Sequence, residues 1–237
     1  MKKSTIIFIS IGVVILVSLV LFLTLGKKGN SNTKTTTKTT TQATKKIELS
    51  ADEKPYINLI PTADGHTLSL KINQIPSKFT SIDYELIYTA KDENIEIEKG
   101  VSGTLKSSDY ASAKDLLLGT ASCTNGCKYK YDEGITGGIL TLTLITDNKE
   151  YVSYETPFVL TNSTDINKEK KIILSEENFT INCITTSKND FFIGLKNFQS
   201  IYSVFSSGNG KGKIISIEPT TITKTDLTSI TGDYTSQ

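Results

Sequence analysis

The alternation of apolar and polar residues that decides the fold is clearest at residues 138–144, Gly138-Ile139-Leu140-Thr141-Leu142-Thr143-Leu144. Successive side chains of a strand point to opposite faces, so a period of two predicts a strand with one buried face. The same alternation occurs at residues 82–88, Ile82-Asp83-Tyr84-Glu85-Leu86-Ile87-Tyr88. These segments predict strands rather than helices.

Outward from these two segments, residues 47–162 contain further short apolar stretches separated by turn residues. We expect strands at residues 56–60, 67–73, 95–98, 101–105 and 151–160. About seven or eight strands in a segment of this length are typical of an immunoglobulin-like or fibronectin-type-III-like β-sandwich. The cysteine and tryptophan pattern of true immunoglobulin domains is missing, because the chain has no tryptophan.

A second region of short strands follows a polar run at residues 161–170, which we interpret as a linker or a long loop. Strands are expected at residues 171–174, 179–184, 191–195, 201–205 and 213–217. Residues 163–225 are therefore a small second β domain or an extension packed on the first sandwich. Residues 226–237 are expected to form a disordered tail. The predicted fold class is all-β.

The N-terminus is expected to be a membrane anchor, residues 1–26. Residues 6–25 carry no charge and lie between Lys3 and Lys27. Twenty helical residues at ~1.5 Å each span the ~30 Å hydrocarbon layer of a bilayer. A cleaved signal peptide and a buried core helix are the alternatives. We expect a single-pass protein of the cell membrane that contacts lipid through this segment, with its C-terminal part outside the cytoplasm.

A Thr- and Lys-rich segment, residues 27–46, has almost nothing apolar to bury and is expected to be a disordered linker. It serves as a stalk whose lysines rest on anionic headgroups, or as an inert spacer.

Charge separates the two parts of the 237-residue chain. All 26 basic residues are lysines, and the net charge is +1. Residues 47–237 hold 18 lysines against 25 acidic residues, so the part expected to fold is acidic. Because bidentate recognition of bases and phosphates depends on arginine, we expect no nucleic-acid partner. One histidine and three cysteines leave little material for metal clusters, and no cofactor is expected.

The cysteines carry the most specific chemistry, in Cys123-Thr124-Asn125-Gly126-Cys127. An Asn-Gly pair supplies the positive-φ positions of a tight turn, so a disulfide between Cys123 and Cys127 is predicted. Cys183 shares its face with apolar neighbours and is expected to be a buried thiol. A Cys₃His zinc site with His66 is the alternative.

Other candidate sites are weaker. Asp92, Glu93, Glu96 and Glu98 are calcium ligands or the solvent side of a strand. His66 is a general base or a surface residue of a turn. A group of tyrosines lines a binding surface or belongs to the core, namely Tyr129, Tyr131, Tyr151 and Tyr154.

The succession of residues 82–88, 99–105, 118–120 and 140–144, with the paired cysteines after Leu118-Gly119-Thr120, resembles one group of proteins. These are uncharacterised membrane-anchored β-sandwich proteins of ultra-small, reduced-genome bacteria. The resemblance covers residues 1–160. It implies an anchor, a low-complexity spacer and a two-cysteine turn, and it implies no activity or catalytic residue.

Three classes of function fit these observations. The first is a surface-displayed binding or adhesion module that is not an enzyme and that binds an extracellular or envelope protein or glycan. The second is a structural or assembly subunit of a cell-envelope complex. The third is an envelope carbohydrate-active enzyme, which requires two carboxylates in one cleft.

Overall fold

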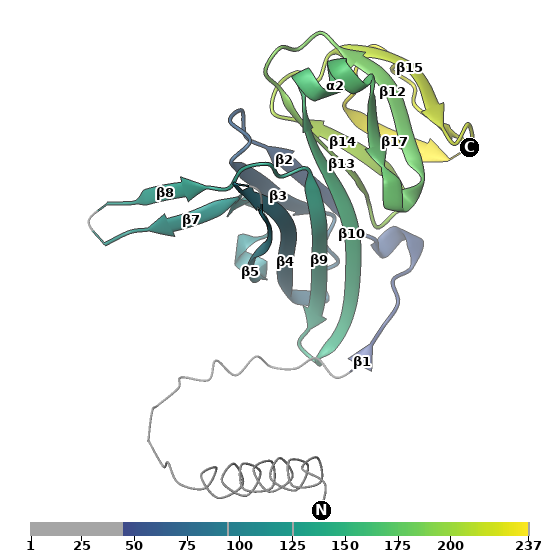
Figure 1. Cartoon of the computed structure of the whole chain (residues 1–237). Helices are drawn as coiled ribbons and strands as arrows, with labels where there is room; N and C mark the ends of the chain where they lie inside the picture. Colours follow the sequence, from purple (N-terminus) through teal and green to yellow (C-terminus); the bar gives the residue numbers. More distant parts are fainter. Residues whose placement is uncertain (1–44, 94, 125, 237) are drawn as a thin grey trace, which may run out of the picture. The chain divides into compact units, whose positions relative to one another are not determined.

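The computed structural model describes residues 45–236 except 94 and 125, and most of these residues lie in strands. The predicted all-β class is confirmed (Figure 1). The strands are β1 (Lys45–Lys46), β2 (Tyr56–Pro61), β3 (Thr67–Asn73), β4 (Phe79–Asp92), β5 (Ile95–Lys106), β6 (Lys114–Leu117), β7 (Gly119–Ser122), β8 (Lys128–Tyr131), β9 (Gly137–Thr146), β10 (Glu150–Asn162), β11 (Lys171–Leu174), β12 (Phe179–Thr185), β13 (Phe191–Lys196), β14 (Tyr202–Ser206), β15 (Gly212–Glu218), β16 (Ile222–Thr223) and β17 (Gly232–Ser236). Helical turns are η1 (Ala51–Glu53), η2 (Ser107–Asp109), α2 (Ser163–Glu169) and η3 (Ser175–Glu177).

One large sheet contains strands from both the N-terminal and the C-terminal half of the described residues, and its main strands have the order β16-β17-β14-β13-β10-β9-β4-β5. Its long strands β4, β9 and β10 are antiparallel neighbours, so that Leu142 lies opposite both Tyr84 and Tyr154. Leu140, Leu142 and Leu144 are fully buried while the threonines between them are less so. The alternation at residues 138–144 therefore identifies a strand with one buried face, as predicted.

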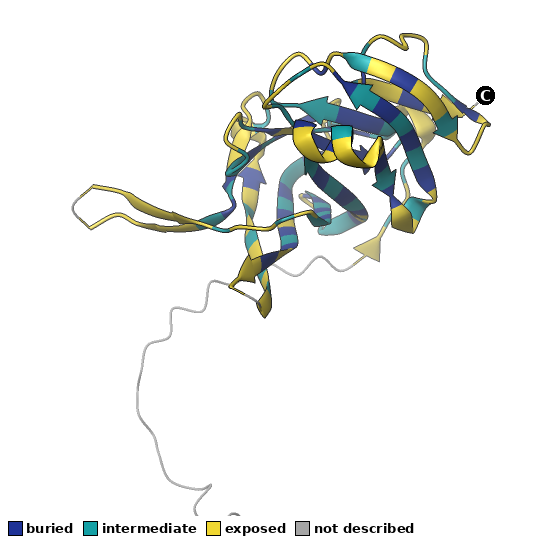
Figure 2. Cartoon of the chain, turned by 45° about the horizontal axis from the view of Figure 1, so that its top comes forward, coloured by how far each residue is buried: buried dark blue, intermediate teal, exposed yellow. Residues whose placement is uncertain are grey.

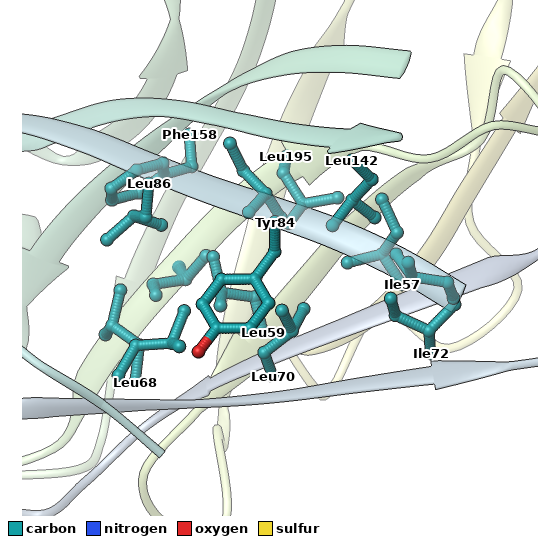
Figure 3. Close-up of a cluster of buried hydrophobic side chains, with 14 of the residues drawn as sticks. Ile57, Leu59, Leu68, Leu70, Ile72, Tyr84, Leu86, Leu142, Phe158 and Leu195 are labelled. Atoms are coloured by element: carbon teal, nitrogen blue, oxygen red, sulfur yellow. The ribbon is translucent and has the colours of Figure 1, made fainter. Parts of the chain in front are cut away.

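The first hydrophobic core lies between this sheet and a sheet of β2, β3 and β6. Figure 3 shows Leu59, Leu68 and Leu70 of the smaller sheet facing Tyr84 and Leu86 of β4. The side chains in this layer occupy alternate positions along their strands, which is why short alternating segments suffice to build the core.

A second core lies on the opposite face of the large sheet, under a sheet of β11, β12 and β15 and beside α2. Strand β13 serves both cores. Phe192 belongs to the second core, whereas Ile193 and Leu195 on the other face belong to the first. The large sheet therefore continues through the boundary expected at residue 162, and its strand β13 contributes side chains to the cores of both halves.

Both halves use the same arrangement of their first five main strands. In the first half the first, second and fifth strands (β2, β3, β6) form the small sheet, and β4 pairs with β5. In the second half β11, β12 and β15 form the small sheet, and β13 pairs with β14. The first five strands of the second half thus repeat the strand pairing of those in the first half, but β13 pairs on its other side with β10 of the first half.

Two expectations for the second half are wrong. The polar run expected as a linker or loop contains helix α2, because the Asn162 side chain accepts hydrogen bonds from the backbone N–H groups of Thr164 and Asp165 and caps it. The tail expected to be disordered contains strand β17, which pairs with β14. Ile230 and Tyr234 are fully buried there.

The predicted anchor and nearly all of the predicted linker lie outside the described residues. At the end of that linker, Lys45 and Lys46 pair in parallel with β10 as strand β1. Within residues 45–236, no helix has the length and apolar character needed to cross a membrane.

Candidate functional site

Strands β7 and β8 form a hairpin that projects away from the stacked sheets and is exposed along most of its length (Figures 1 and 2). The hairpin is inserted between β6 and β9, two strands of the first half. Its ladder pairs Gly119 with Tyr131 and Ala121 with Tyr129. A segment with so little apolar surface to bury folds back on itself instead of joining a core.

One face of the hairpin carries a row of aromatic rings. Tyr129 and Tyr131 are two residues apart on β8, which places them on the same face, and their ring centroids are 6.0 Å apart with nearly parallel planes. The His66 ring stacks on Tyr131 at 4.1 Å. Because the residues opposite the tyrosines are Gly119 and Ala121, no large side chain of β7 covers the rings. Tyr129 remains 53% exposed and Tyr131 40% exposed.

The base of the hairpin is fixed to the large sheet by Asp132. Its side chain is only 4% exposed, accepts a hydrogen bond from the Tyr88 hydroxyl at 2.8 Å and forms an ion pair with Lys99. Burial, with the hydrogen bond to Asp132, raises the pKa of Tyr88 well above its usual value. The backbone adds bonds from Leu118 N–H to the His66 carbonyl and from Asp132 N–H to the Leu118 carbonyl. The aromatic rings therefore lie on a hairpin whose base is held in place by β4, through Tyr88, and by β5, through Lys99.

A concavity of about 340 Å³ adjoins the aromatic row at this base. Tyr131 and Lys130 line it from β8, and Ile97 and Lys99 line it from β5. A larger cleft of about 470 Å³ lies elsewhere, between β4, β9 and β10 and the β11–η3 segment. Glu98 and Glu176 are the carboxylates in the lining of that cleft.

The cysteines are arranged as predicted. Cys123 and Cys127 form a disulfide across the tip of the hairpin. Cys183 is free and fully buried in the second core. Burial raises the pKa of its thiol to about 12. The structure does not bring the thiols and His66 together as the zinc alternative requires, because two of the three sulfur atoms are bonded to each other at the tip.

We expect the folded protein to resist alkylation by iodoacetamide at mildly alkaline pH, because a buried thiol with a raised pKa provides almost no thiolate. Adding urea should expose one reactive thiol, and urea with a reductant should expose three. Peptide mapping by mass spectrometry gives the sites. Labelling of Cys183 in the folded chain, or a disulfide that includes it, would contradict the assignment.

The remaining sequence candidates have different places. Tyr154 belongs to the first core, where its ring stacks on Phe198 at 3.9 Å and its hydroxyl donates to the Lys196 carbonyl. Tyr151 is partly buried on β10, opposite Lys46. The four tyrosines are thus not one surface. In the described part of the chain, no three His, Cys, Asp or Glu side chains gather as metal ligands would, the acidic residues at positions 92–98 included.

Sequence reasoning placed Tyr129 and Tyr131 in one group with Tyr151 and Tyr154, and it did not join His66 to them. The signal that could have found the hairpin is the sequence Lys128-Tyr129-Lys130-Tyr131, which alternates with period two directly after a cysteine-closed turn. The contact between His66 and Tyr131 joins residues far apart in the chain and has no local signal.

Comparisons with protein-family models, curated proteins and solved structures found no match to this chain.

Proposed function

We propose that this chain is a membrane-anchored, extracytoplasmic binding module that holds a macromolecular partner through the aromatic face of the β7–β8 hairpin and catalyses no reaction. The observation that supports the proposal is the row of His66, Tyr131 and Tyr129. Exposed aromatic side chains on a fixed support are characteristic of interaction surfaces, because large rings lose little conformational freedom when they are buried.

The stacked sheets of the first half fit a sandwich of the fibronectin-type-III-like kind. Its first, second and fifth strands form one sheet, and the other sheet has the order β5-β4-β9-β10. That order corresponds to the fourth, third, sixth and seventh strands of the half when the hairpin is set aside, as in fibronectin type III domains. In this assignment the hairpin is an insertion between the fifth and sixth strands, where sandwiches of this kind tolerate long loops.

The location remains the one expected from the uncharged segment at residues 6–25. A disulfide at the hairpin tip supports an extracytoplasmic location, since such bonds persist in oxidising compartments.

The test places a photo-crosslinking amino acid at position 129 in the full chain, expressed in intact source cells. We expect a crosslink to a macromolecule other than the chain itself. Position 215 is the matched control, because Ile215 is 61% exposed on β15 of the second half. Replacing Tyr129 and Tyr131 by serine should lower capture of that partner about thirtyfold, the cost of losing ~2 kcal/mol at an aromatic hot spot.

The matched Ile215→Ser variant should leave capture unchanged. Equal crosslinking from positions 129 and 215, or capture that survives loss of both tyrosines, would show that the aromatic face is not the binding surface.

A further inference from the structure

Strand β5 is the longest open edge in the described part of the chain. It forms one end of the large sheet and has twelve residues. At the opposite end of the sheet, strand β16 has two residues. A long unpaired edge offers a row of backbone donors and acceptors that another strand can bind.

Two other edges, those of β2 and β15, are partly covered by the chain itself. On β2, the Asn197 side chain bonds both the N–H and the carbonyl of Ile57. On β15, the N–H groups of Gly212 and Ile214 donate to carbonyls at residues 228 and 227. Along β5, only one outward group has such a cover, the Lys106 N–H, which donates to the Asp109 carboxylate.

The register of the β4–β5 hairpin determines which backbone groups of β5 face outward. Asp92 pairs with Ile95 across a two-residue turn, and in such hairpins this first pair is hydrogen-bonded. Hydrogen-bonded and non-hydrogen-bonded pairs then alternate along an antiparallel ladder. Residues 95, 97, 99, 101, 103 and 105 therefore bond to β4, and the even-numbered residues from 96 to 106 direct their N–H and carbonyl groups outward.

We propose that a second copy of this chain pairs with this edge, β5 antiparallel to β5, about a two-fold axis that passes through Val101. Such a contact uses the same strand of both copies and joins their two large sheets into one.

The sequence of β5 is complementary to itself in this register. On one face Glu96 lies opposite Lys106 of the second copy, twice by symmetry, and Glu98 lies opposite Thr104. Because the Lys106 N–H stays bonded to Asp109, each 96–106 pair contributes its side chains and one backbone bond rather than two. On the other face Ile97 lies opposite Leu105, and Val101 lies opposite its own copy. No two like charges are opposed, since Lys99 meets Gly103. Opposite charges and apolar pairs across a ladder stabilise it, whereas opposed like charges destabilise it.

Neighbouring registers lose this match. With the axis at Gly100, Glu96 meets Thr104 and Lys99 meets Val101. When the axis passes through Ser102, the ion pair of Glu98 with Lys106 survives, but Lys99 meets Leu105 and Val101 meets Gly103. The register centred on Val101 is the one that satisfies both faces.

Cysteine crosslinking of the full chain tests the register. In the proposed dimer Val101 forms a non-hydrogen-bonded pair with its own copy, so the two Cα atoms lie about 4.5 Å apart, within reach of a disulfide. Gly100 and Ser102 each lie diagonally from their own copies, at about 7–8 Å, which is too far. We expect Val101→Cys to give a covalent dimer on mild oxidation, and Gly100→Cys and Ser102→Cys to stay monomeric.

Charge reversal provides the second arm. Glu96→Lys and Lys106→Glu should each lower the Val101→Cys crosslink yield about tenfold, because two ion pairs become two repulsions, and the double reversal should restore the yield. Light scattering of the unsubstituted chain in detergent should show a mass that rises toward that of a dimer with concentration.

The result is separable from the hairpin's role, since serine at Tyr129 and Tyr131 should leave crosslinking unchanged. A strictly monomeric chain, or equal crosslinking from positions 100, 101 and 102, would overturn the proposal. The charged side chains of β5 would then serve to prevent another strand from pairing with this edge.

Discussion

Tyr234→Ala is expected to lower the free energy of unfolding by about 3–5 kcal/mol, the usual cost of removing a fully buried aromatic ring. The Tyr234 side chain is completely buried in the second core, three residues before the end of the chain. Its ring meets Phe179 edge-on at 5.5 Å, and its hydroxyl donates to the Ile230 carbonyl at 2.6 Å. A loss of this size is a large share of the stability of a typical domain, ~5–15 kcal/mol.

Urea denaturation followed by circular dichroism measures this change. Tyr234→Phe separates the ring from the hydroxyl and should cost about 1 kcal/mol, the net value of one hydrogen bond. Thr235→Ala is the control on the same strand, because Thr235 is exposed and should change stability by no more than about 0.5 kcal/mol. If Tyr234→Ala behaves like Thr235→Ala, strand β17 does not hold the second core together.

Asn197→Leu should destabilise the chain by about 2–5 kcal/mol, although leucine has a similar volume and is more apolar. Asn197 is buried, accepts from the Ile57 N–H at 2.6 Å and donates to the Ile57 carbonyl at 3.2 Å. It also donates to the Ser203 hydroxyl. Leucine would leave two buried backbone groups without partners, at about 1–3 kcal/mol each.

Gln199→Ala is the matched control for Asn197→Leu. Gln199 also reaches back to the first half, to the Lys54 carbonyl and the Gln74 side chain, but it does so near the surface. It should cost less than about 1 kcal/mol. Hydrogen exchange at the Ile57 amide gives a local readout, with protection lost in Asn197→Leu and kept in Gln199→Ala. Retained protection in Asn197→Leu would mean that another group bonds the edge of β2.

The main strands could be predicted from sequence because burial of one face leaves a period of two. Every predicted segment from residue 56 to residue 217 overlaps a strand of the structure. The segment at 191–195 was also predicted as a strand, although it lacks the period of two. Phe191-Phe192-Ile193-Gly194-Leu195 does not alternate, because β13 is buried on both faces, and a continuous apolar run is the expected signature of such a strand.

Other elements could not be predicted because little of their sequence is buried. In β17 only Tyr234 is buried among Gly232–Ser236, so one residue carries the whole signal for that strand. Helix α2 buries only Ser163 and Ile166. In both cases contacts with distant strands, rather than a local pattern, determine the structure.

The candidate site was half predictable. The disulfide followed from the turn residues between Cys123 and Cys127, and the tyrosines of β8 were named. Tyr129 and Tyr131 are exposed because β8 lies in a hairpin that leaves the core, whereas Tyr154 packs against the first core. The local sequence around these tyrosines does not distinguish the two environments.

Strand β13 also sets how this chain could change over evolution. In a chain of separable domains, one domain can be lost, duplicated or exchanged while the other remains intact. Here Phe192 packs in one core while Ile193 and Leu195 pack in the other, so neither half can be lost or exchanged without disrupting the other. A recombination event between residues 162 and 191 would give each product one open face. Viable variation should therefore collect in the part of the β7–β8 hairpin outside its aromatic row, because the hairpin contributes to neither core.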